Sequence, residues 1–179
     1  TYNWLVDGGS ITNGAGTNEI TVTWDWVTPL PGNRTVTVTH TNNGCETPLF
    51  VKWVTINPLP DTPGAGDVTV CYDGLIHTGS ASVVPEVEEA VWYTAASGGT
   101  VTTAPARSAV GSSSAWAAAR IIATGCESAT RTLVTVTIHA IPTAVITGNQ
   151  SVCIGVTATL SVALTGKAPW NYYWSDGST

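Results

Sequence analysis

The clearest pattern in this sequence opens at Val70-Cys71-Tyr72-Asp73-Gly74, continues through Val91-Trp92-Tyr93 and closes at Gly125-Cys126-Glu127. Parts of this pattern recur at a constant interval. Cys153 lies 82 residues after Cys71, and Trp174 lies 82 residues after Trp92. A single interval shared by two residue types indicates tandem modules of about 80 residues, each of them one structural unit.

Two further signatures repeat at the same interval and place the module boundaries. Pro142 follows Pro60 by 82 residues, and Gly-Cys-Glu occurs at both 44–46 and 125–127. We therefore predict an N-terminally incomplete module at 1–60, a complete module at 61–142, and the start of a further module at 143–179. The chain reads as a fragment of a longer polypeptide.

The composition argues against several classes of partner. Charged residues make up 10% of the chain and the formal net charge is −6. A weakly acidic chain has no basic surface for nucleic acid or anionic lipid. No apolar run is long enough to span a bilayer as a helix, so we predict no membrane insertion in this segment.

The local patterns are those of short strands separated by turns. Residues 19–26 alternate apolar and polar side chains, and Asn43-Gly44 is a strong hairpin signal. In the middle module we predict strands near 68–72, 81–84, 89–94, 100–103, 115–123 and 131–138. Short strands with regular turns predict an all-β fold of tandem immunoglobulin-like or PKD-like β-sandwiches.

Two proline-containing stretches are the predicted linkers between modules. The first is 57–67, with Pro58 and Pro60, and the second is 139–149, with Pro142. Proline removes a backbone donor and restricts the chain, so we expect short, semi-rigid joints.

The alanine-rich stretch at 115–123 is ambiguous. Its alanines favour a helical turn, whereas its place between two predicted strands of a β module favours a strand. We predict a strand.

The complete module carries one cysteine near each end, Cys71 and Cys126. We favour a disulfide between them, which would constrain the unfolded chain by about 4 kcal/mol and would imply an oxidising, extracytoplasmic location. The alternative is two free buried thiols. Cys45 and Cys153 would then have partners outside this chain.

The tryptophans are predicted to serve mainly as core residues. Trp4, Trp92 and Trp174 lie at strand centres, where a β-sandwich buries an aromatic side chain, and are the expected core anchors. Trp53, Trp116 and Trp170 have no clearly assigned face. Trp170 and Trp116 are the candidates for an exposed glycan contact.

No catalytic residues are predicted. The histidines and the acidic cluster have no nucleophile or second carboxylate placed beside them in sequence; they are His40, His77, His139, Glu86, Glu88 and Glu89. No cofactor is predicted. Calcium between modules is a weaker alternative, because three carboxylates follow one another around the first linker, at Asp61, Asp67 and Asp73.

The chain resembles a known family of repeat modules. The first module is similar to PKD-like modules at Trp4-Leu5-Val6-Asp7-Gly8-Gly9, Asn43-Gly44-Cys45 and Pro58-Leu59-Pro60. The middle module resembles Ig-like modules at Val70-Cys71, Val91-Trp92-Tyr93 and Thr124-Gly125-Cys126, and 151–177 looks like the start of another repeat. Such modules alternate in giant surface adhesins of Bacteroidota that are exported by type 9 secretion and serve gliding motility.

The resemblance implies a structural segment of a bacterial cell-surface adhesin, an extended stalk exposed outside the cell. Its implied partners are extracellular surfaces or polysaccharide, neighbouring repeats of the same chain, and the secretion and gliding machinery. Two alternatives remain open: a carbohydrate-binding module, and a spacer in a secreted hydrolase.

Overall fold

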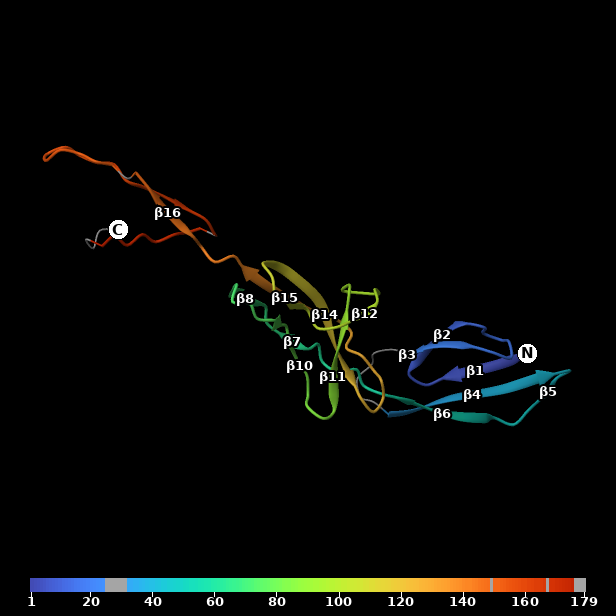
Figure 1. Ribbon diagram of the computed structural model, residues 1–179. Helices are drawn as coiled ribbons and strands as arrows, with labels where there is room; N and C mark the ends of the chain where they lie inside the picture. The colour runs from blue at the N-terminus through green and yellow to red at the C-terminus, as the bar shows by residue number, and fades with distance from the viewer. Residues whose placement is uncertain (25–31, 149, 167, 176–179) are drawn as a thin grey trace. The chain divides into compact units, whose positions relative to one another are not determined.

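The computed structural model describes residues 1–24, 32–148, 150–166 and 168–175 (Figure 1). Every regular element in these residues is a strand, from β1 to β17, and none is a helix. The predicted all-β class is confirmed, with several sheets arranged as expected of a β-sandwich. Trp26 and Asp176-Gly177, which entered the predictions above, lie outside the described residues.

Backbone contacts divide the chain into two compact units. Unit 1 comprises Thr1–Pro60 together with the turn Ile121–Cys126, and unit 2 comprises Asp61–Arg120 and Glu127–Thr179. The division into three modules stays a prediction.

Unit 1 is built around one long strand. It contains β1 (Tyr2–Val6), β2 (Gly9–Asn13), β3 (Thr21–Trp24), β4 (Gly32–Asn42), β5 (Cys45–Glu46) and β6 (Phe50–Ile56). β4 pairs antiparallel with both β1 and β6, and β2 and β3 form a separate hairpin. The half-buried Trp4 on β1 donates its indole N–H to the Thr17 carbonyl oxygen at 2.8 Å.

The predicted hairpin turn at Asn43-Gly44 is confirmed. Asn42 pairs with Cys45 across the turn, and Asn43 and Gly44 have φ values of 50° and 80°. Two successive residues with positive φ match the right-handed twist of the flanking strands, and asparagine followed by glycine accepts that conformation most easily.

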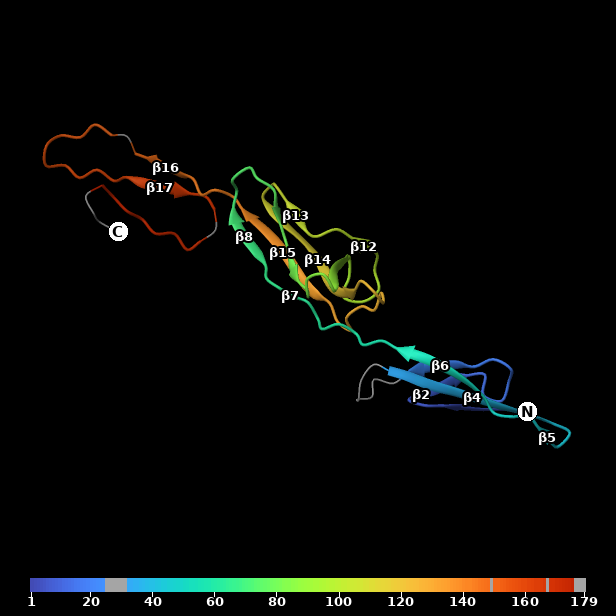
Figure 2. The same ribbon diagram turned by 90° about the horizontal axis from the view of Figure 1, so that it is seen from below.

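Unit 2 contains a five-stranded sheet in the order β12-β11-β14-β15-β8 (Figure 2). Its members are β8 (Val68–Cys71), β11 (Glu88–Tyr93), β12 (Val101–Thr102), β14 (Gly111–Ile121) and β15 (Thr132–His139). Three short pairs complete the unit: β7 (Gly64–Ala65) with β10 (Ala81–Ser82), β9 (His77–Thr78) with β13 (Ala106–Arg107), and β16 (Ala144–Thr147) with β17 (Ser161–Leu164).

One face of the five-stranded sheet carries the core. Ala115 lies opposite Val134, and the next inward residues along β15 are Val136 and Ile138, all between 0% and 4% exposed. The short ladders form the covering layer, because a methyl group on Gly79 would lie 2.7 Å from the Val134 side chain and 2.9 Å from Pro105. The core is therefore narrow and made of small aliphatic side chains.

The alanine-rich stretch forms a strand, as predicted, within β14. It pairs antiparallel with β15 from Gly111 to Ala117. Ala117, Ala118 and Ala119 have no exposed surface, so both faces of this strand are covered. Tertiary pairing thus outweighs the helical preference of alanine.

The predicted linkers are too long. Gly64-Ala65 lies inside the first and forms β7, while Ala144–Thr147 lies inside the second and forms β16. The sequence signal was misleading because prolines at 58, 60 and 63 surround a short paired segment. Pro60 and Pro63 are buried.

The predicted core anchors are not in the buried core. Trp4 and Trp92 are half-buried and Trp174 is 39% exposed, whereas Val91, next to Trp92, is 7% exposed. Successive strand residues point to opposite faces, so burying Val91 turns Trp92 to the other face of the sheet. Trp92 lies in the run Val91-Trp92-Tyr93, where apolar residues do not alternate with polar ones.

The predicted disulfide between Cys71 and Cys126 is wrong. All four cysteines are described and all are free. Cys71 lies beside His139 at the end of β15, while Glu127, the neighbour of Cys126, bridges Arg120 before β15 begins. The eight residues of β15 span roughly 25 Å, far beyond the Cα separation of about 7 Å that a disulfide tolerates.

Candidate functional site

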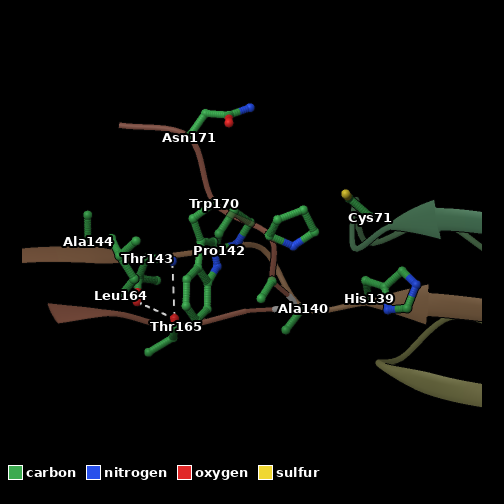
Figure 3. A pocket seen from close by; sticks show the side chains of 12 residues that line it. Cys71, His139, Ala140, Pro142, Thr143, Ala144, Leu164, Thr165, Trp170 and Asn171 are labelled. Carbon is green, nitrogen blue, oxygen red and sulfur yellow. Dashed lines mark hydrogen bonds between the residues drawn. The ribbon is translucent and has the colours of Figure 1, made fainter. Parts of the chain in front are cut away.

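A pocket of about 580 Å³ in unit 2 contains Trp170, one of the two predicted glycan contacts (Figure 3). Its walls come from the ends of β8 and β15, the segment 140–144, the end of β17, and residues 168–171. Pro142, Leu164, Pro169 and Trp170 supply most of its apolar surface. A largely apolar hollow with a few polar groups is the usual form of a small-ligand site.

One end of the pocket is formed by Cys71 and His139. Strands β8 and β15 run parallel and place these two residues opposite each other, and the Tyr72 N–H donates to the His139 carbonyl oxygen at 2.8 Å. The thiol is exposed and the imidazole is half-buried. No hydrogen bond joins them in the described structure, so the pair lacks the contact through which a histidine activates a thiol.

The opposite wall is held by Thr143 and Thr165. The Thr143 N–H donates to the Thr165 hydroxyl oxygen at 3.1 Å, the Thr165 N–H donates to the Thr143 carbonyl oxygen at 2.9 Å, and the two hydroxyls also bond to each other. These bonds continue the β16–β17 ladder beyond its ends. Both hydroxyls are therefore engaged in shaping the wall.

The exposed aromatic and amide groups are the free recognition elements. Trp170 is 40% exposed, and Asn171 is exposed beside it, with its side chain pointing away from the β16–β17 wall in Figure 3. Trp116, the other predicted contact, is half-buried opposite Leu133 and does not line the pocket. The structure thus separates the two candidates.

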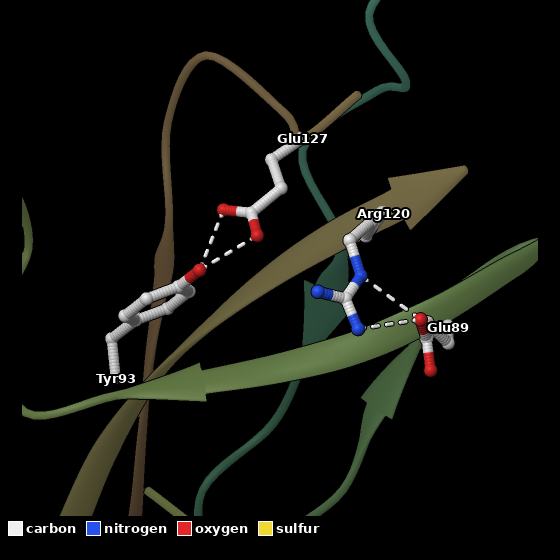
Figure 4. A network of polar contacts seen from close by, with 4 residues as sticks. All are labelled: Glu89, Tyr93, Arg120 and Glu127. Atoms are coloured by element: carbon white, nitrogen blue, oxygen red, sulfur yellow. Dashed lines mark hydrogen bonds and ion pairs between the residues drawn. The ribbon is translucent and has the colours of Figure 1, made fainter. Parts of the chain in front are cut away.

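A polar network on the five-stranded sheet is centred on Tyr93 (Figure 4). The phenol donates to both carboxylate oxygens of Glu127, at 2.6 and 2.8 Å, and the Arg131 guanidinium lies 3.3 Å from the centre of the Tyr93 ring. The hydrogen bond to Glu127, helped by burial, raises the pKa of Tyr93 above its usual value. Arg131 also donates to the carbonyl oxygens of Ala95 and Gly98.

Beside this network, Arg120 donates to Glu89 through two nitrogens, at 2.9 and 2.7 Å (Figure 4). The hydrogen bond to Glu89 raises the pKa of Arg120. Glu88 accepts from the Val84 N–H at 3.0 Å, and Glu86 occupies a turn with a φ of 65°. These contacts are of a kind that fixes strands and turns.

The three carboxylates considered for calcium have other partners or lie apart. Asp67 accepts from the Thr135 N–H at 2.8 Å, and Asp73 accepts from the Leu75 N–H and from His77. The bond from the Leu75 amide, followed by that from His77, lowers the pKa of Asp73. Asp61 is exposed. Among the described residues, no three histidine, cysteine or acidic side chains gather closely enough to hold a metal ion.

Sequence reasoning identified Trp170 but not the pocket around it. Cys71 and Asn171 are separated by 100 residues and are brought to one hollow by strand pairing. The recurrence of Ile-Pro and Leu-Pro was the available signal, since Pro142 forms part of the pocket wall. His40 and His77 lie elsewhere; His40 contacts the Tyr2 ring in unit 1.

Comparison of the sequence with protein-family models gave no match, and comparison with curated proteins also gave none. In the part of the chain that the structure describes, no helix has the length and apolarity needed to cross a membrane.

Proposed function

We propose that this chain is a structural segment of a large adhesin on a bacterial cell surface, acting as an extended stalk in adhesion and gliding motility. The support is the 82-residue recurrence in the sequence, combined with an all-β architecture. On this proposal the segment is extracellular, reaches the surface by type 9 secretion, and continues into neighbouring repeats.

The observation that carries the proposal is the pairing of the first and last strands of the five-stranded sheet's hydrogen-bonded ladder in the middle segment. β8 runs parallel to β15, in the register Val68 to Val136 through Cys71 to His139. Tension applied at the start of β8 and the end of β15 pulls two parallel strands in opposite directions along their axes. All bonds of the ladder then share the load, which suits a segment that transmits force.

The load-bearing role is tested by stretching the chain from its ends in a single-molecule force measurement. Tyr72→Pro removes the N–H that donates to His139 at 2.8 Å, so we expect a lower unfolding force for unit 2. Tyr72→Phe keeps that donor and is the matched control. Equal forces for the two variants would contradict the shared-load geometry.

The biological role is tested on intact cells of the source organism. An antibody to this chain is used on denaturing gels before and after protease shaving. A very large species that disappears on shaving supports the adhesin stalk. A released protein of ordinary enzyme size would overturn it and favour the alternative of a spacer in a secreted hydrolase.

A second candidate function is carbohydrate binding at the Trp170 pocket. It is favoured by the 40% exposure of Trp170 beside the amide of Asn171. Titration of tryptophan fluorescence with soluble polysaccharides tests it, with Trp170→Ala expected to abolish the signal. A Trp170→Ala chain that responds like the unaltered one would exclude this pocket.

A further inference from the structure

Trp53 is the most exposed tryptophan for which an exposure is resolved, and it lies in the middle of a strand. It is 69% exposed on β6, in register with Thr35 on β4. Its neighbours in sequence, Val54 and, two residues further, Ile56, are half-buried. Because successive residues alternate between faces, burial of Val54 turns Trp53 to the outer face of the β1–β4–β6 sheet.

The side chains around Trp53 are polar and uncharged. Thr35 is directly opposite, Thr37 lies one diagonal step away, and Thr55 follows on the same side of β6. The described structure records no intramolecular hydrogen bond for the hydroxyl of Thr35 or Thr37. Thr55 donates to the Asn33 side-chain oxygen at 2.8 Å, so the amide N–H groups of Asn33 remain available.

Two further exposed apolar side chains complete this surface. Leu5 and Val51 share a row across Thr37, and they are 72% and 45% exposed. We call the surface the Trp53 face; it consists of Leu5, Asn33, Thr35, Thr37, Val51, Trp53 and Thr55. It contains no ionisable side chain, and Lys52 belongs to the opposite face.

We infer that the Trp53 face binds a neutral polysaccharide, with one pyranose ring stacked on the Trp53 indole. A pyranose whose hydroxyls are equatorial presents an apolar C–H face, which matches the electron-rich face of an indole. Its hydroxyls point outward around the ring, where Thr35, Thr37 and Asn33 offer hydrogen-bond partners. The absence of charge on the face selects a neutral glycan over a polyanion.

The pattern of the face favours a sugar over a protein partner. Leu5 and Val51 are separated by Thr37, so the apolar side chains do not merge into one continuous patch. The centre of a protein–protein interface is typically more continuous and more apolar. This binding role goes beyond the stalk, and it is independent of the Trp170 pocket, which lies in the other unit.

The inference is tested by depletion of the full chain from solution on cellulose and chitin particles, followed by calorimetric titration with cello- and chito-oligosaccharides. We expect retention on at least one of these neutral β-linked glycans. Retention should persist in 1 M salt, at which the screening length falls to about 3 Å, because no charge on the face contributes.

Three variants assign the binding to this face. Trp53→Ala should weaken binding at least about tenfold, equivalent to about 1.4 kcal/mol, whereas Trp53→Tyr should retain part of it because an aromatic face remains. Trp170→Ala is the matched control in unit 2 and should bind like the unaltered chain. Trp53 is exposed, so Trp53→Ala should keep the amide exchange pattern of β4.

Several results would overturn the inference. These are failure of the unaltered chain to bind any of the glycans, equal binding by Trp53→Ala, and loss of binding in high salt. A self-association that Trp53→Ala abolishes, without glycan binding, would instead identify the Trp53 face as a contact between copies of this chain.

Discussion

The two units bury their apolar side chains to different extents. In unit 2, Val134, Val136 and Ile138 are at most 1% exposed, under a covering layer that includes Gly79. In unit 1, the inward residues of β1 and β4 are only half-buried in the described structure. The outer face of its sheet carries Trp53 and Leu5 in the open.

Side-chain size explains much of this difference. β14 places alanine at successive positions, and Gly79 allows the covering layer to approach Val134 closely. Small residues let two layers meet without gaps, and close packing brings both hydrophobic and dispersion stabilisation. Unit 1 relies on a larger aromatic, Trp4, whose indole N–H must be bonded to the Thr17 carbonyl oxygen. Stability is therefore concentrated in unit 2, while the open aromatic surface lies on unit 1.

The largest expected effect comes from removing core volume. Ile138→Ala should lower the free energy of unfolding of unit 2 by about 2–5 kcal/mol, because the side chain is 1% exposed. Ile11→Ala, at a half-buried position of β2 in unit 1, should cost only about 1 kcal/mol. Strand-resolved hydrogen exchange measures both. Equal losses would contradict the proposed difference between the cores.

The next effect comes from overpacking the covering layer. A Cβ at position 79 would lie 2.7 Å from Val134 and 2.9 Å from Pro105, so Gly79→Ala should destabilise unit 2 by about 1–3 kcal/mol. Gly66→Ala is the matched control, since a Cβ there meets nothing within 4 Å. Urea denaturation compares the two. A neutral Gly79→Ala would show that the layers are looser than described.

A smaller effect is expected at Tyr93. Tyr93→Phe removes the hydrogen bonds to Glu127 and should cost about 1 kcal/mol. Tyr72→Phe, at an exposed position, is the control and should be nearly neutral. Thermal unfolding of the three chains at neutral pH gives the comparison, and equal melting temperatures would remove the network from the account of unit 2's stability.

The same tyrosine predicts a pH dependence on the alkaline side. Its pKa is raised in the folded chain, so its contribution is complete below the unfolded value of about 10 and is lost as the pH rises through the folded value. Phenolate absorbance should show one tyrosine titrating late, and Tyr93→Phe should remove that late step. A late step that survives the substitution would assign it to another tyrosine.

The smallest effect is expected on the acid side, at Asp73. The Leu75 amide and His77 lower the pKa of this exposed carboxyl, so its contribution is present above the unfolded value of about 3.9 and is lost as the pH falls through the folded value. Asp73→Asn should flatten this part of the stability profile. Carboxyl titration by NMR checks the direction, and a raised pKa would contradict it.

Much of the local structure was predictable because it depends on neighbouring residues. Alternation predicted the strands that became β3, β11 and β15, and Asn43-Gly44 predicted its turn. The side chains to be buried were less predictable. Val91 and Trp92 are both apolar, so the sequence did not say which of them faces the core.

The candidate sites show the same limit. Trp170 was predicted as an exposed aromatic, yet its pocket needs Cys71 and His139, which the parallel pairing of β8 with β15 brings near. Trp53 had no assigned face because β6 carries apolar residues on both sides and Lys52 on the inner one. Spacing alone suggested a disulfide between Cys71 and Cys126, but spacing contains no information on the direction of the strands between them.

The sequence by itself determined the all-β class, the positions of most strands and the 82-residue recurrence, because alternation, turn chemistry and repetition are properties of the chain alone. The tertiary structure decided which tryptophans are open to solvent, which strands pair in parallel, and that the four thiols remain free. The physical reason is that exposure and pairing depend on contacts between residues far apart in the chain. Val68 and Val136, for example, meet only when the sheet has formed.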